Sequence, residues 1–117
     1  MDELCMISLL LDYYGQMVTK RQYEVLDLHY NSDYSFGEIA GELNISRQGV
    51  YDNIKRGKAA LFELEQKLGL IGRFNRQKDK ASEILKTLEE IDFSSLSDKD
   101  SRNLEKAKQT VRSIMED

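Results

Sequence analysis

The chain has 117 residues, a net charge of −4, no proline and seven glycines, and this balance favours helix throughout and an all-α fold. Its single cysteine, Cys5, excludes an internal disulfide and indicates a reducing compartment. Because no apolar run approaches about 18 residues and the first residues are acidic, we expect no membrane span and no signal peptide, and therefore a cytoplasmic protein.

Two helices are predicted before residue 31. Apolar residues at helical spacing predict a helix over residues 2–14, which Gly15 ends. Thr19 and Gln22 match a capping box, in which each side chain satisfies a free amide of the other residue, and they open a second helix. The apolar face predicted for these helices consists of Leu4, Ile7, Leu10, Leu11, Tyr14, Tyr23, Leu26 and Tyr30.

Residues 36–68 have the pattern of a helix-turn-helix. Ser35 and Ser46 can cap a short helix and a long one, and the residues between the two helices form a tight turn. The turn needs a small residue on the first helix, here Ala40, and a residue that tolerates left-handed backbone, here Asn44. The residues that match the motif are Ala40, Asn44, Ile45, Val50 and Ile54. The alternative is an ordinary pair of core helices.

An apolar stripe continues along the long helix. Val50, Ile54, Gly57, Leu61, Leu64 and Leu68 follow one another at steps of 4, 3, 4, 3 and 4 residues, which is a heptad-like spacing. The stripe predicts a helical partner, either within the same chain or in a second copy, and both interpretations stay open. Gly57 lies on the stripe and allows unusually close approach of a neighbouring backbone.

The outward face of the long helix contains the candidate nucleic-acid contacts. At about 100° per residue, and with Val50 and Ile54 inside, this face and its flanks bring together polar and aromatic side chains. The candidates are Ser46, Arg47, Gln48, Tyr51, Asp52, Lys55, Arg56 and Lys58. They fall in or beside residues 47–80, which have 9 basic and 4 acidic side chains, net +5, whereas residues 1–46 are net −6 and residues 81–117 net −3.

The chemistry of these candidates suggests separate roles. Gln48 suits adenine, Arg47 suits guanine or a phosphate, and the lysines and Arg56 suit phosphate. Asp52 can accept a hydrogen bond from a cytosine amine but would repel a phosphate. A solvated helix face is the alternative interpretation for all of these charges.

The last third predicts two further helices after a joint at Gly69 and Gly72. The first runs from Phe74 to Ile91, and Ser97 caps the second. Their predicted apolar stripes are Ala81, Ile84, Leu85, Leu88 and Ile91, and Leu104, Ala107, Val111 and Ile114. We therefore predict a helix-turn-helix domain at residues 1–70 and a helical extension at residues 71–117 for packing or dimerisation.

The sequence resembles two known families. Residues 19–26, 36–40 and 45–51 resemble region 4 of bacterial sigma factors, which reads a promoter element. The whole chain is similar to the YlxM family of helix-turn-helix proteins of Gram-positive bacteria, most closely in residues 11–15 and 46–52. The resemblance implies an all-helical fold, with a sigma-region-4-like helix-turn-helix bundle and additional C-terminal helices that can serve dimerisation.

The resemblance also bears on function. Sigma-factor contact positions correspond to Arg47, Gln48, Tyr51 and Lys55, whereas Gly49 and Asp52 depart from the polar or basic residues usual there. YlxM genes lie beside those of the signal recognition particle, which implies a regulatory or accessory role in protein targeting.

Two binding functions are therefore expected, and catalysis is not. The first is a homodimeric DNA-binding regulator, and the alternative is an accessory protein that binds signal recognition particle RNA or a protein component. His29 is the only histidine, and no cysteine or acidic cluster is spaced with it for a metal, so we expect a structural histidine and neither metal nor cofactor. Cys5 is expected to behave as a small hydrophobe on an apolar helix.

Overall fold

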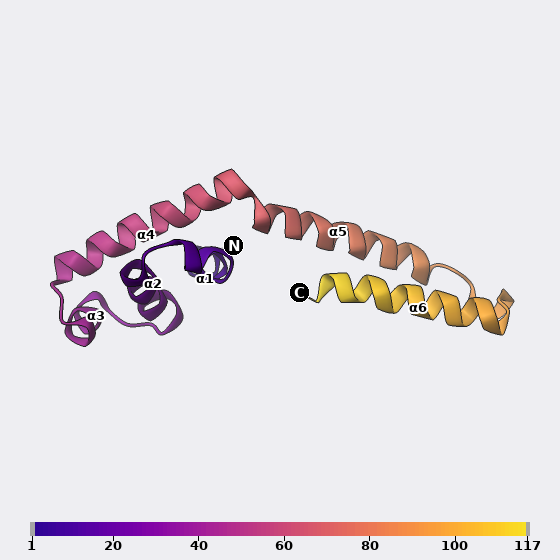
Figure 1. Ribbon diagram of the computed structural model, residues 1–117. Coiled ribbons are helices and arrows are strands. Elements are labelled where there is room, and N and C mark those ends of the chain that lie inside the picture. The colour runs from indigo at the N-terminus through magenta and orange to yellow at the C-terminus, as the bar shows by residue number, and fades with distance from the viewer. Residues whose placement is uncertain (1, 117) are drawn as a thin grey trace. The chain divides into compact units, whose positions relative to one another are not determined.

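The computed structural model of the protein describes residues 2–116, and all regular structure among them is helical (Figure 1). In chain order the elements are α1 (Glu3–Tyr14), η1 (Gly15–Met17), α2 (Lys20–Leu26), η2 (Asp27–Asn31), α3 (Phe36–Leu43), α4 (Arg47–Leu68), α5 (Leu70–Glu89), η3 (Phe93–Ser95) and α6 (Asp98–Met115). The chain divides into two compact units, an N-terminal unit up to Ile71 and a C-terminal unit from Gly72.

Side-chain caps begin the helices where the sequence predicts them. Thr19 and Gln22 form the predicted capping box, with both hydrogen bonds at 3.1 Å. Ser35 forms a second box with Glu38, and Ser46 and Ser97 each accept one backbone N–H in the first turn of their helices. These four caps satisfy amides that a helix leaves unpaired, so the starts of α2, α3, α4 and α6 agree with the prediction.

The core of the N-terminal unit lies where α1, α2 and α3 pack along one side of α4 (Figure 1). Its buried side chains are Ile7, Leu10, Leu11, Tyr14, Val25, Leu26, Ile39, Val50, Ile54, Leu61 and Ile71. The α4 stripe is buried in this core from Val50 to Leu61, so its partner over that length is in the same chain. Leu68, at the end of the stripe, is 43% exposed and lies outside the core.

Gly57 allows α2 to approach α4 closely, as predicted. A Cβ atom at this position would lie 2.7 Å from Leu26 Cδ1 and 3.3 Å from Gln22 Cβ. Leu26 is completely buried and has little room to move. The absence of a side chain at Gly57 therefore sets the separation of α2 and α4.

The second helix changes its winding beyond Leu26. There α2 ends, and residues 27–31 form η2, a wider π-helical turn in which Tyr30 is partly buried and packs against the core. Tyr23 is 37% exposed and lies over Gly15, where an added Cβ would be 2.6 Å from its ring. Leu4, also predicted to be buried, is 52% exposed.

The predicted joint after α4 is shorter than expected. Only Gly69 interrupts the helix, with φ +63°, and its N–H donates to the Glu65 carbonyl at 2.8 Å. The next helix, α5, begins at Leu70, so Gly72 lies within it. A left-handed C-cap at a single glycine is enough to end one helix before the next begins.

Side chains from α1 and α4 stabilise the start of α5. The Tyr14 hydroxyl donates to Glu65 Oε1 at 2.5 Å and accepts the Leu70 N–H at 3.1 Å. The Ile71 N–H donates to the same Glu65 oxygen at 3.1 Å. Two of the amides that a helix start leaves unpaired are therefore satisfied by the Tyr14 and Glu65 side chains. Burial raises the pKa of Tyr14, so its hydroxyl remains a donor.

The C-terminal unit is an antiparallel pair of helices, α5 and α6, joined through η3 (Figure 1). Its buried residues from Gly72 onward are Ala81, Lys108 and Val111. The prediction placed Ala107 on the apolar face of α6, but Ala107 is exposed and Lys108 takes that place. The Lys108 ammonium lies 4.3 Å from the centre of the Phe93 ring, so a cation–π contact compensates for its burial.

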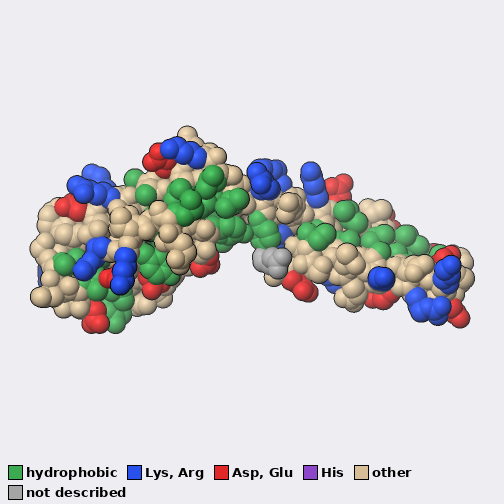
Figure 2. Space-filling model, in the orientation of Figure 1, with side chains coloured by type: hydrophobic (Ala, Val, Ile, Leu, Met, Phe, Trp, Pro, Cys, Tyr) green, Lys and Arg blue, Asp and Glu red, His purple; other side chains and the backbone are tan. Residues whose placement is uncertain are grey.

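Much of the predicted apolar surface of this unit remains exposed, as Figure 2 shows. Ile84 and Ile114 are 49% and 44% exposed and, with Gln77, Lys80 and Ala81, line a cavity of about 350 Å³. Helix α5 ends at Glu89, two residues before the predicted end, and Ile91 is 40% exposed. No described helix is long and apolar enough to cross a bilayer.

Candidate nucleic-acid interface

The turn between α3 and α4 has the predicted helix-turn-helix geometry. Asn44 has left-handed backbone angles, φ 56° and ψ 48°. The N–H groups of Asn44 and Ile45 both donate to the Ala40 carbonyl, the latter at 3.1 Å. These bonds close the end of α3, and the left-handed residue turns the chain into α4 without a long loop.

The first turn of α4 has a side-chain cap and no acidic residue. Ser46 Oγ accepts the Gly49 N–H at 2.9 Å, and the Asn53 side chain donates to the Gly49 carbonyl at 2.8 Å. A 22-residue helix that begins here directs its free amides and the positive end of its dipole outward. No acidic residue lies in this first turn to oppose that field.

The predicted contact residues lie on the accessible side of α4, and Figure 2 shows Lys and Arg side chains over its first half. Ser46, Arg47, Gln48, Tyr51, Lys55 and Arg56 are exposed, and Asp52 and Lys58 are half-buried. The structure therefore brings the candidates together on one helix, while their contact with nucleic acid stays a prediction.

Two of these residues contact neighbouring residues within the protein. The Gln48 amide donates to Asp52 Oδ1 at 3.1 Å, so the Asp52 carboxylate is occupied by the residue one turn earlier. The Arg47 guanidinium lies against Gly37, where an added Cβ would be 2.9 Å from a terminal nitrogen. Gly37 thus leaves space for Arg47 to lie across the start of α3.

Lys58 is paired within the protein. Its ammonium forms an ion pair with Glu3 at the start of α1 and lies 5.9 Å from the centre of the Tyr30 ring. The Tyr30 hydroxyl donates to the same Glu3 oxygen at 3.3 Å. The Lys58 ammonium lowers the pKa of Glu3, and Glu3 raises the pKa of Lys58, so both groups are charged at neutral pH.

A pocket of about 260 Å³ opens beside these residues on the flank of α4. It is lined by Tyr30, Phe36, Tyr51, Ile54, Lys55 and Lys58, and we call it the aromatic pocket. The Phe36 and Tyr51 rings are 6.4 Å apart between centroids and inclined at 60°. Tyr30, Phe36 and Glu3 were not among the predicted site residues, because they reach α4 only through the tertiary fold.

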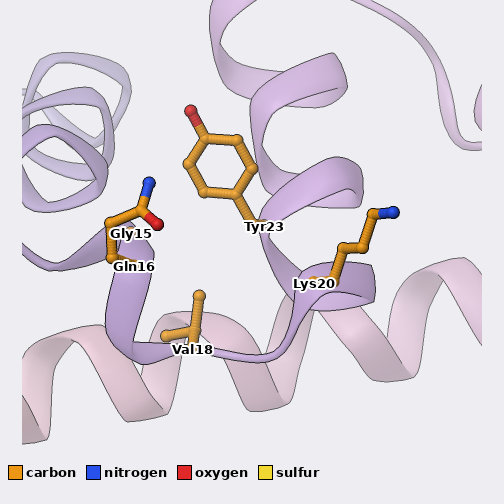
Figure 3. A pocket seen from close by; sticks show the side chains of 5 residues that line it. All are labelled: Gly15, Gln16, Val18, Lys20 and Tyr23. Carbon is orange, nitrogen blue, oxygen red and sulfur yellow. The ribbon is translucent and has the colours of Figure 1, made fainter.

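Another pocket, of about 230 Å³, lies between η1 and the start of α2 (Figure 3). Gln16, Val18 and Tyr23 face it, and Lys20 extends away from them. These side chains include no paired acid and base and no nucleophile next to a base, so this pocket does not have the composition of a catalytic site.

His29 and Cys5 have structural surroundings. His29 Nδ1 is 2.8 Å from the Tyr34 carbonyl oxygen, and its ring packs 5.0 Å from Phe36, which agrees with the predicted structural role. Cys5 is exposed, not packed as a small hydrophobe, and the nearby Asp2 raises its thiol pKa. Within residues 2–116 no three His, Cys, Asp or Glu side chains are grouped to hold a metal ion.

Comparison with known proteins identifies the family. A family model described as "Putative helix-turn-helix protein, YlxM / p13 like" matches residues 1–108. The chain belongs to this family, UPF0122. A UPF0122 protein of Acetivibrio thermocellus is 55% identical over 116 residues, which cover 99% of each chain. One from Desulforamulus reducens is 37% identical over 116 residues, 99% of this chain and 96% of the relative.

Membership in UPF0122 confirms the predicted resemblance to YlxM proteins and agrees with the helix-turn-helix seen in α3 and α4. A UPF0122 protein of Lacticaseibacillus casei is 49% identical over 70 residues, 60% of this chain and 62% of the relative. The family is described by a structural motif typical of binding proteins and not by an enzymatic activity.

Proposed function

We propose that this protein is a non-catalytic DNA-binding regulator that inserts the first turns of α4 into the major groove. The observation that supports this most directly is the exposed face of α4. Arg47, Gln48 and Lys55 lie on this face, after the turn at which Asn44 has left-handed backbone angles. Helices in this position read base edges with their first residues, and cations farther along contact phosphates. A cytoplasmic location is part of this proposal.

The contacts within the protein suggest how sequence is read. Gln48 can bind adenine through Oε1 and one Nε2 hydrogen while its other Nε2 hydrogen stays on Asp52. We propose that Asp52 orients the Gln48 amide for adenine in this way.

We further propose that DNA is bound by a homodimer joined through α5 and α6. A pair of helices leaves apolar side chains exposed on the sides that do not face each other. Here Ile84 and Ile114 are exposed beside a cavity of about 350 Å³. A second copy of the pair would complete a four-helix bundle. A two-fold dimer suits two half-sites about 34 Å apart.

Equilibrium sedimentation tests the dimer. Ile84→Glu places a charge in the proposed interface and should convert a dimer to a monomer with unchanged helix content. Ser82→Glu, on a neighbouring position of α5, is the control for added charge. A monomeric native protein, or a dimer that tolerates Ile84→Glu, would contradict this interface.

Selection from a random-sequence duplex library, followed by anisotropy titration at several salt concentrations, tests DNA binding. If Lys55 contacts a phosphate, Lys55→Ala should lower the salt dependence, −dlogK/dlog[salt], by about 0.9. Gln48→Ala should relax the selected sequence and leave this salt dependence unchanged. Lys67→Ala is the matched control, because Lys67 lies on the same helix but pairs with Glu63 at 2.8 Å.

The alternative is an accessory role, with binding to signal recognition particle RNA or to a protein component of the particle. The exposed Tyr51 ring favours RNA, since an unpaired base can stack on it. A gel shift with that RNA against duplex DNA separates the two functions. If neither shifts at low salt, both nucleic-acid proposals fail.

A further inference from the structure

The aromatic pocket combines flat rings with positive charge. Tyr30 comes from η2, Phe36 from the first turn of α3 and Tyr51 from α4, so three elements bring aromatic side chains to one place. Lys55 and Lys58, one and two turns beyond Tyr51, line the same space. The Tyr51 ring is 48% exposed and therefore available to a ligand without unpacking the core.

The size and the chemistry of this pocket restrict its occupant. Its volume, about 260 Å³, is below the range of roughly 300–1,000 Å³ for sites of drug-sized ligands, so the enclosed part of a ligand is small. Aromatic side chains stack on nucleobases irrespective of base identity, and lysines attract phosphate. One base with its phosphate satisfies both requirements, whereas an apolar ligand leaves the lysines unused.

Glu3 already shows where an anion binds beside this pocket. Its carboxylate contacts both the Lys58 ammonium and the Tyr30 hydroxyl. Glu3 is the first residue of α1, and its side chain is 58% exposed, so it can withdraw without moving the core. A phosphate oxygen offers the same acceptor to the same two donors.

We propose that the aromatic pocket binds one unpaired nucleotide, with its base against Tyr51 and Phe36 and its phosphate in place of the Glu3 carboxylate on Lys58 and Tyr30. Glu3 then acts as an internal competitor that weakens binding. This site extends the surface of α4 proposed to bind nucleic acid, although a free nucleotide could occupy it without any contact to a duplex.

Isothermal titration with AMP, GMP, CMP and UMP tests the base-binding end of the site, with adenosine and inorganic phosphate as separate probes. Tyr51→Ala should weaken nucleotide binding about tenfold, which is about 1.4 kcal/mol, and Tyr51→Phe should restore it because the ring remains. Phe62→Ala is the matched control, since Phe62 is a similarly exposed ring (46%) on the same helix outside the pocket. Inorganic phosphate binding as tightly as AMP would overturn the role of the rings.

Glu3→Gln tests the competition at the phosphate end. Removing the charge frees Lys58 and should strengthen AMP binding by up to about fivefold, the factor that an exposed ion pair supplies, without changing adenosine binding. Glu63→Gln breaks a comparable exposed pair with Lys67 and should change neither. Unchanged or weaker AMP binding by folded Glu3→Gln would contradict the competition.

A short single-stranded RNA, a single-stranded DNA and a duplex DNA distinguish the sources of the nucleotide. If Tyr51→Ala weakens the binding of single strands, the ligand is an unpaired nucleotide within a strand. If AMP binds tightly and single strands do not, the ligand is a free nucleotide. If no single strand and no mononucleotide binds in a way that depends on Tyr51, the pocket proposal fails, even when the duplex binds. If duplex DNA does not bind but a single strand or a mononucleotide does, the proposed regulator function is contradicted and the pocket proposal stands.

Discussion

The two units of this chain bury very different amounts of apolar surface. In the N-terminal unit, α1, α2 and α3 surround one side of α4 with a contiguous core that includes fully buried Tyr14 and Leu61. In the C-terminal unit, burial is limited to Ala81, Lys108 and Val111, and large apolar side chains remain exposed. The N-terminal unit therefore has a core that can hold an exposed helix face in place. The helix pair depends for its stability on helix propensity and on packing against a further surface.

Core truncation should show the largest contrast between the units. Leu61→Ala leaves a cavity in a packed core and should cost about 2–5 kcal/mol of unfolding free energy. Val111→Ala removes fewer carbon atoms, from a residue that has few buried neighbours, and should cost about 1 kcal/mol of unfolding free energy. All six tyrosines lie between residues 13 and 51, so tyrosine fluorescence in urea monitors the N-terminal unit, and circular dichroism monitors both. Equal losses in the two variants would contradict the comparison.

Tyr14→Phe tests how strongly tertiary contacts hold the start of α5. The variant keeps the ring but removes the hydroxyl that bridges Glu65 and the Leu70 N–H. Losing hydrogen bonds to these part-buried partners, one of which is a carboxylate, should cost about 1–3 kcal/mol in tyrosine-detected urea unfolding. Tyr13→Phe, on the adjacent half-buried ring, is the control and should cost less.

Lys108→Ala tests the weaker packing of the C-terminal unit. The change removes a buried stem and a cation 4.3 Å from the Phe93 ring, and should cost about 1–2 kcal/mol in a thermal melt followed by circular dichroism. The control is Lys106→Ala, since Lys106 is exposed on the same helix. If the two variants melt alike, the Phe93 contact does not stabilise the unit.

The smallest expected effect is a pH dependence at the start of α1. The Cys5 N–H bonds the Asp2 carboxylate and lowers the pKa of Asp2 below its usual 3.8. The ionised side chain therefore stabilises the fold fully above pH 3.8 and loses this contribution as the pH falls through the lowered folded pKa. Asp2→Asn caps the helix without ionising, so its stability relative to native protein should rise between about pH 6 and about pH 3 in tyrosine-detected unfolding.

The helix-turn-helix was predictable because its requirements are local. The caps at Thr19, Ser35 and Ser46 and the left-handed Asn44 depend on residues within one or two turns of each other. Gly57 was predictable too, because a glycine within an apolar stripe has few explanations other than a close neighbour.

The remaining features depend on contacts between residues far apart in the chain. Glu3 and Lys58 are 55 residues apart, and neither has a local pattern that indicates the other. The start of α5 was misplaced because the Tyr14 hydroxyl, 56 residues earlier in the chain, accepts the Leu70 N–H. Lys108 was not included in the apolar stripe because its charge conceals an apolar stem, and only the position of Phe93 shows how that charge is accommodated.

In the π-helical turn at Asp27–Asn31, the number of residues matters independently of which residues they are. A π-helical turn holds about one residue more than an α-helical turn, so deleting a single residue there would let the regular helix continue through this segment. Tyr30 would then change its position relative to Lys58, although every side chain of the pocket would still be present. Among relatives, a gap in this turn would be a stronger sign of a changed ligand than a substitution in the pocket itself.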